Sequence, residues 1–128
     1  MKLPVNPNEM NNCFAEAYNS GKIENLTALF ETDAQSVTMT GSILSGIGSI
    51  KEDLEKLLLL GGRMISVNRF AVQYGDISLL RADWTITTKD NLGKEIHIKG
   101  ASAEVVRRQA DGTWLYIIDH PFGANAGL

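Results

Sequence analysis

The segment A-D-G-T-W-L-Y-I-I-D-H-P-F-G, residues 110–123, decides the fold that the sequence predicts. It contains Asp111-Gly112, a dipeptide typical of tight hairpin turns, and then five large apolar residues in succession. Strict alternation would divide the side chains of this strand between two faces, with Trp114, Tyr116 and Ile118 on one and Leu115, Ile117 and Asp119 on the other. Both faces are apolar, so we expect both to be covered.

Upstream of this segment, runs rich in β-branched residues predict three more strands. They lie at about 64–74, 77–88 and 94–108, and the last strand lies at about 113–119. The separators are short and consist of turn-forming residues, so neighbouring strands should pair antiparallel as a meander.

The first half of the chain predicts helices. Asn6-Pro7-Asn8-Glu9 supplies a capping side chain, a proline at the first helical position and an acid three residues after the cap. This helix should end at Gly21, a second short helix covers about 23–30, and a small hairpin turns at Gly41. A second capping box, residues 49–52, should open a third helix.

Helices followed by a run of strands predict an α+β fold. We expect one domain over residues 1–128, with three N-terminal helices packed on a curved antiparallel sheet of four to six strands. The helices can cover one face of that sheet. We therefore expect the other face to meet a second copy of the chain in a homodimer.

Composition excludes several classes of protein. The net charge is −3 and no basic block occurs, which argues against a nucleic-acid surface. No apolar run is long enough to span a membrane, and the N-terminus is too polar for a signal peptide. Cys13 is the single cysteine, so a reducing, cytoplasmic location is expected. The two histidines have no ligand spacing, so no metal site is expected.

Three segments carry a resemblance to a known family: residues 16–34, G-I-G-S-I-K at 46–51, and 107–123. In these segments and in the order of its elements the chain resembles the SnoaL-like branch of the nuclear-transport-factor-2-like superfamily, which includes ketosteroid isomerases and limonene epoxide hydrolases. The resemblance implies a cone-shaped fold with a central pocket for a small apolar molecule, and no cofactor. It does not fix a reaction, because members place different chemistry in the same pocket.

The positions that matter in ketosteroid isomerases are largely altered here. Phe14 stands at the position of a hydrogen-bonding tyrosine and Thr38 at the position of the base, while the acid position falls near Glu104. Steroid isomerisation is therefore disfavoured. We expect the pocket to be lined by the substrate-binding residues Phe14, Tyr18, Thr38, Ile117 and His120.

The resemblance to the epoxide hydrolases suggests catalytic residues. Arg81 and Asp83 match an Arg-x-Asp pattern, and Asp119 matches a second acid near the end of the last strand. Arg81 and Asp83 are two apart, so they share a face, and we expect Asp119 to meet them across the cavity. Such a cluster would keep one acid protonated and the other ionised. The alternative is a structural ion pair at the surface of the sheet.

Two functions remain open from the sequence. One is a small acid–base enzyme of the isomerase, cyclase or epoxide-hydrolase type, acting on a modest apolar molecule through Arg81, Asp83 and Asp119. The other is a non-catalytic module that binds a small ligand or serves as a dimeric assembly unit.

Overall fold

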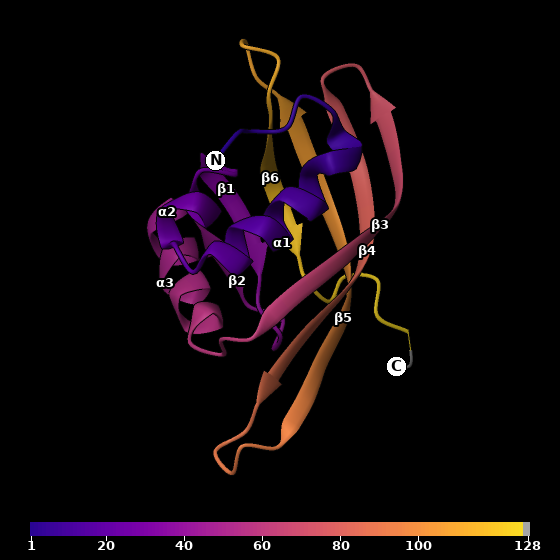
Figure 1. Ribbon diagram of the computed structural model, residues 1–128. Helices are drawn as coiled ribbons and strands as arrows, with labels where there is room; N and C mark the ends of the chain where they lie inside the picture. The colour runs from indigo at the N-terminus through magenta and orange to yellow at the C-terminus, as the bar shows by residue number, and fades with distance from the viewer. Residues whose placement is uncertain (127–128) are drawn as a thin grey trace.

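The computed structural model describes residues 1–126 and shows helices packed on one face of a curved six-stranded sheet (Figure 1). The elements in chain order are a 3-10 helix η1 (Pro7–Glu9), α1 (Met10–Ser20), α2 (Ile23–Thr27), β1 (Phe30–Val37), β2 (Ile43–Ser45), α3 (Ile47–Leu58), β3 (Arg63–Tyr74), β4 (Ile77–Lys89), β5 (Glu95–Arg108) and β6 (Trp114–His120). The α+β prediction is confirmed.

The sheet has the strand order β2-β1-β6-β5-β4-β3. The meander of β3 to β6 is antiparallel throughout, and each of its strands agrees with the prediction to within one residue at either end. The expectation of a wholly antiparallel sheet is wrong at one place, because β1 runs parallel to β6. That pairing places β1, from the first half of the chain, beside β6, from the second half, in the middle of the sheet (Figure 1).

Two element boundaries differ from the prediction. The third helix begins at Ile47, and its N-terminal cap is Gly46 at φ 86°, a conformation that favours glycine; the predicted Ser49 cap lies inside the helix. The spacing of apolar residues predicts that Phe30 belongs to the second helix, but Phe30 is the first residue of β1. Its ring is buried beside Tyr116, so tertiary packing of this aromatic side chain outweighs its helical spacing.

The core lies between the helices and the concave face of the sheet, which we call the inner face. In β4 the even-numbered residues are buried and point inward, from Ser78 to Ile86, while the odd-numbered residues point to the opposite, outer face. The inward side chains meet Met10 and Ala17 of α1 and Ile50 and Leu54 of α3. Amphipathic helices over an alternating strand account for this single core.

Strand β6 does not alternate strictly, because it contains a β-bulge at Ile117. Val106 pairs with Tyr116 and Val105 with Ile118, so Ile117 has no partner on β5. The extra residue changes the phase of the strand after Tyr116. Asp119 is consequently buried on the same face as Tyr116, and Ile118 is 42% exposed on the outer face. The predicted division of this strand into two faces is therefore wrong beyond the bulge.

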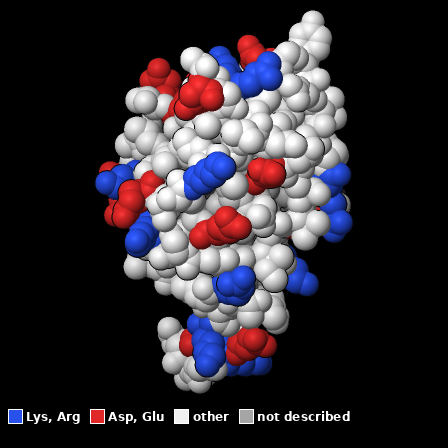
Figure 2. Space-filling model, turned by 45° about the horizontal axis from the view of Figure 1, so that its top comes forward, with Lys and Arg blue, Asp and Glu red and all other residues white. Residues whose placement is uncertain are grey.

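The surface carries basic and acidic side chains interspersed over the face seen in Figure 2. Within residues 1–126, no helix is both long and apolar enough to cross a membrane.

Gly100 on β5 allows Trp84 to lie flat against the sheet. The two residues are cross-strand partners, and a methyl group on Gly100 would overlap the indole ring of Trp84. The indole Nε1 donates a hydrogen bond to the carbonyl oxygen of Pro121 at 2.7 Å, and Phe122 packs edge-on against the ring. Trp84 therefore ties β4 to the segment that follows β6.

We predict that Gly100→Ala lowers the free energy of unfolding by roughly 1–3 kcal/mol, because overpacking would displace Trp84 from this position. Urea denaturation measures the loss. Gly48→Ala is the matched control: Gly48 lies in α3 with nothing near its Cβ position, so this change should stabilise the protein by about 0.5–1 kcal/mol. Equal stability of the Gly100→Ala variant and the wild type would contradict the packing argument.

Candidate functional site

A cavity of about 280 Å³ lies between the helices and the inner face of the sheet. Its walls are mainly apolar and include Phe14, Leu54, Leu57, Trp84, Ile98 and Phe122. Met39, Asp53, Lys56 and Leu60 also line the cavity but are exposed, so they mark its opening. A concave apolar site with a few convergent polar groups is the usual form of a small-molecule site.

The buried polar end of the cavity contains two carboxyl groups. Glu104 of β5 and Asp119 of β6 are direct cross-strand partners, and both line the cavity. They are only 4% and 7% exposed. Side chains paired in this way have Cβ atoms about 4.5–5.5 Å apart, so the two carboxyl groups share one environment. Ser36 pairs with Asp119 from the other side and also lines the cavity.

Burial makes ionisation of this acid pair costly. Desolvation raises the pKa of Glu104 from 4.5 to about 7, although hydrogen bonds from Ser102 and Asn11 partly oppose the shift. The pKa of Asp119 is raised well above its ordinary value by burial, and further by the negative charges of Glu104 and Asp53. Near neutral pH the pair therefore holds at least one proton, the state that one proton donor beside one acceptor requires.

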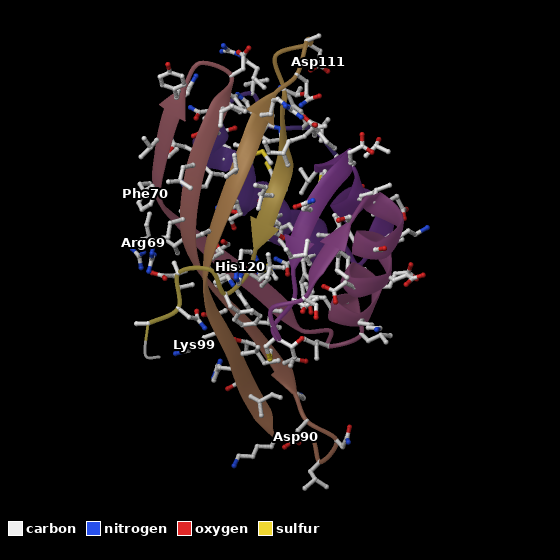
Figure 3. All side chains as sticks on the ribbon, turned by 180° about the vertical axis from the view of Figure 1, so that it is seen from behind. Arg69, Phe70, Asp90, Lys99, Asp111 and His120 are labelled. Carbon is white, nitrogen blue, oxygen red and sulfur yellow. The ribbon has the colours of Figure 1, made fainter. Side chains whose placement is uncertain are left out.

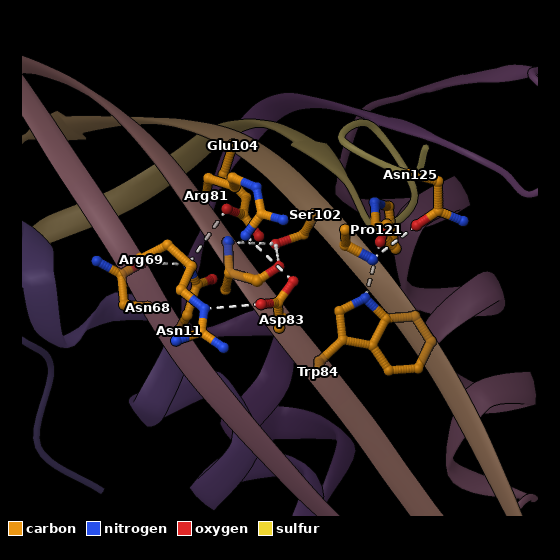
Figure 4. Close-up of polar contacts among 12 residues, drawn as sticks. Asn11, Asn68, Arg69, Arg81, Asp83, Trp84, Ser102, Glu104, Pro121 and Asn125 are labelled. Carbon is orange, nitrogen blue, oxygen red and sulfur yellow. Dashed lines mark hydrogen bonds and ion pairs between the residues drawn. The ribbon is translucent and has the colours of Figure 1, made fainter. Parts of the chain in front are cut away.

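Asn11 of α1 connects the acid pair to the rest of the core (Figure 4). Its Nδ2 donates to Glu104 Oε1 at 3.2 Å and to Asn68 Oδ1 at 2.9 Å. The hydroxyl of Tyr116 donates to Asn11 Oδ1 at 2.8 Å. Asn11 and Tyr116 are 3% and 1% exposed, so this network is shielded from water.

The predicted convergence of Arg81 and Asp83 with Asp119 is wrong. Arg81 and Asp83 lie on the outer face, where Asp83 Oδ2 accepts from Arg69 Nε at 2.7 Å and Asp83 Oδ1 lies 3.1 Å from Arg81 Nη1 (Figure 4). The side chain of Asp83 is 41% exposed. Its hydrogen bond from Arg69, and then the charges of both arginines, hold the pKa of Asp83 below its ordinary value. These contacts agree with the alternative of a structural ion pair.

The directions in which the side chains of β4 and β6 point explain why Arg81 and Asp83 do not meet Asp119. The inward positions of β4 around Arg81 are taken by Leu80 and Ala82, and the bulge at Ile117 turns Asp119 inward. Arg81 and Asp83 do share a face, as predicted, but it is the face opposite the cavity.

The predicted substrate-binding residues divide into two groups. Phe14 and Thr38 line the cavity. Tyr18, Ile117 and His120 do not: the Tyr18 hydroxyl donates to the carbonyl oxygen of Gly61 at 2.7 Å, and Ile117 forms the bulge. His120 aligns with Ala103 and Arg81 across the sheet and packs against Gly123, where the chain leaves β6 (Figure 3).

Glu104 and Asn11 were not proposed as site residues from the sequence. The resemblance did place an acid near Glu104, and a further signal was present, because Glu104 is in phase with Ser102 and Val106 on one face of its strand. Asn11 gives no comparable signal. Its partner Glu104 is 93 residues away, so only the fold brings them together.

The chain matches no protein-family model and no curated protein. Solved structures share its fold. An NTF2-like protein with a cystatin-like fold from Novosphingobium aromaticivorans has a TM-score of 0.77 and 15% identity, over 94% of this chain and 80% of that one. A cystatin-like domain of unknown function from Nostoc punctiforme has a TM-score of 0.76 and 16% identity, over 93% and 75%.

A ketosteroid isomerase-like protein from Erwinia carotovora atroseptica has a TM-score of 0.75 and 17% identity, over 87% of this chain and 88% of that one. The fold of this chain is therefore the NTF2-like, cystatin-like fold that the sequence resemblance predicted.

Proposed function

We propose that this protein is a cofactor-independent acid–base enzyme that acts on a small, mainly apolar and uncharged molecule bearing a carbonyl or an epoxide. The observation that carries the proposal is the buried pair of Glu104 and Asp119 at the polar end of an otherwise apolar cavity. The fold shared with a ketosteroid isomerase-like protein supports the same class of chemistry. The proposed reactions do not include steroid isomerisation, because Thr38 at the expected base position cannot take a proton from carbon.

The acid pair can take one proton from a bound molecule and give one proton to it. In an enolisation, ionised Glu104 takes a proton from the carbon beside the carbonyl, and Asp119 gives its proton to the carbonyl oxygen. In the opening of an epoxide, Glu104 takes a proton from the attacking water while Asp119 protonates the ring oxygen, which leaves a diol. In the epoxide case the proton must return from Glu104 to Asp119 before the next cycle.

Deuterium exchange tests the proposal without knowledge of the natural substrate. Small cyclic ketones and epoxides are incubated with the protein in deuterated water and followed by proton NMR. We expect exchange at the carbon beside the carbonyl, or conversion of an epoxide to a diol, for a subset that fits the cavity. Compounds that bind, as seen by line broadening, yet show neither reaction would favour the alternative of a ligand-binding module.

We also propose a homodimer formed through the outer face of the sheet. Val72, Leu79, Val105 and Ile118 are aligned across four strands, and we call them the outer apolar row. Val72, Leu79 and Ile118 are 60%, 45% and 42% exposed. An exposed apolar stripe in the middle of a sheet is unusual on a monomer and is typical of an interface. A second copy related by a two-fold axis would cover it.

Leu79→Lys tests the dimer. A two-fold axis would bring both copies of the new charge into one apolar interface, so we expect the dissociation constant to rise by at least roughly tenfold. Sedimentation velocity should show the wild type at twice the mass of the 14.0 kDa chain and the variant shifted toward the monomer. Leu92→Lys in the β4–β5 turn, where Leu92 is 93% exposed, is the matched control. A monomeric wild type would refute the proposal.

A further inference from the structure

The orientation of the Asn11 amide is fixed by partners that do not belong to the acid pair. Asn68 Nδ2 donates to the carbonyl oxygen of Phe70 at 3.2 Å, which leaves Asn68 Oδ1 facing Asn11. The Tyr116 hydroxyl has a single proton and donates it to Asn11 Oδ1, with 2.8 Å between the two oxygen atoms. The amide nitrogen of Asn11 must therefore point to Asn68 and to Glu104.

This orientation treats the two carboxyl groups differently. Glu104 Oε1 accepts an N–H bond from Asn11, and such a bond favours the ionised form of a carboxyl group. Asp119 is only 7% exposed and lines the cavity. Within residues 1–126, however, no side chain donates a hydrogen bond to it. The pair is thus asymmetric before any ligand binds.

We propose that Asn11 is a positioning residue that assigns the two roles within the acid pair, holding Glu104 as the proton acceptor and leaving Asp119 as the proton donor. The catalytic meaning of this assignment rests on the proposed function. The assignment itself is a property of the protein without substrate, and it can be measured there.

The surrounding charges act in the same direction as Asn11. The negative charge of Asp53 on α3 raises the pKa of Asp119, whereas Lys56 of the same helix is exposed at the opening. Tyr116 of β6 stays protonated, since burial and the neighbouring Glu104, Asp119 and Cys13 raise its pKa. Ser102 lowers the pKa of Glu104 as well, and more than Asn11 does, but its hydroxyl proton also has the Ala82 carbonyl oxygen as a partner at 3.3 Å. Asn11 supplies a hydrogen bond to Glu104 from an amide whose orientation is fixed by other partners.

Carboxyl ¹³C NMR of protein labelled at Asp and Glu tests the assignment. In the wild type, the Glu104 carboxyl carbon should titrate at lower pH than that of Asp119. In Asn11→Leu, which has nearly the same shape but no donor, the Glu104 midpoint should rise by roughly one pH unit or more. A Glu104 midpoint that does not move, or an Asp119 that ionises first in the wild type, would overturn the proposal.

Tyr116→Phe is the matched control within the same network. It removes one buried hydrogen bond to Asn11 but keeps the bond from Asn11 to Glu104, so the order of ionisation should be unchanged. An equal shift in both variants would show a general effect of lost packing and would count against the specific role of Asn11. If Asn11→Leu does not fold, Asn11→Ala removes the same donor and gives the same test. Absence of turnover with the expected order intact would refute the proposed function and leave the assignment standing.

Discussion

Asp119→Asn is expected to lower turnover by roughly 10²–10⁴-fold, the usual contribution of a positioned general acid. Asparagine has nearly the same shape as protonated aspartic acid, so the cavity and the β1–β6–β5 pairing should remain intact. It cannot release a proton to a substrate oxygen. Because Asp119 is buried with a raised pKa, the substitution also removes an acid whose ionisation is costly in the folded state. The variant should therefore be at least as stable as the wild type at neutral pH.

The measurement is turnover of any compound found by deuterium exchange, together with the midpoint of urea denaturation. Asp83→Asn on the outer face is the matched control: it is the same chemical change at a residue whose partners are Arg69 and Arg81, away from the cavity. Its turnover should equal that of the wild type. If the two variants lose activity equally, the acid pair is not the catalytic unit.

Stability is expected to fall as pH rises from about 5 to about 8, by an amount on the order of 3 kcal/mol from Glu104 alone. The pKa of Glu104 is about 7 in the folded state against 4.5 ordinarily, so between these values the folded chain holds a proton that the unfolded chain has released. The contribution is complete below the unfolded value and is lost as pH passes through the folded value. The raised pKa of Asp119 acts in the same direction.

Glu104→Gln should remove the share of this dependence that comes from Glu104. The glutamine oxygen still accepts from Asn11, while no ionisation occurs, so the variant should exceed the wild type in unfolding free energy at about pH 8 and approach it at about pH 5. Urea denaturation at several pH values measures both curves. Parallel curves for the two proteins would mean that Glu104 is not the group whose burial opposes ionisation.

Much of the architecture was predictable because its signals are local. Turn residues such as Asp111-Gly112 act over two to four positions, and they set the meander of β3 to β6 without reference to distant parts of the chain. The phase of β4 was also readable. Its residues Leu80, Ala82, Trp84 and Ile86 are apolar, whereas Arg81, Asp83, Thr85 and Thr87 are polar, so alternation alone places Arg81 and Asp83 outward. The expected convergence with Asp119 followed the resemblance to the epoxide hydrolases instead.

The candidate site was only partly predictable, because its contacts depend on pairing between distant segments. Asp119 was recognised as a site residue, yet its true partner Glu104 is set by the β5–β6 register and by the bulge at Ile117. A bulge is a mismatch between two strands and has no signature in one of them. The Asn11 amide depends on Asn68 and Tyr116, which the fold brings from 57 and 105 residues away.

The unpaired Ile117 allows the length of the last strand to change without moving the acid near its end. Excision of this isoleucine would leave Ile118, Asp119 and His120 opposite Val105, Glu104 and Ala103, and regular alternation would still direct Asp119 inward. A single-codon deletion should therefore remove the irregularity and preserve both carboxylic acids of the chamber.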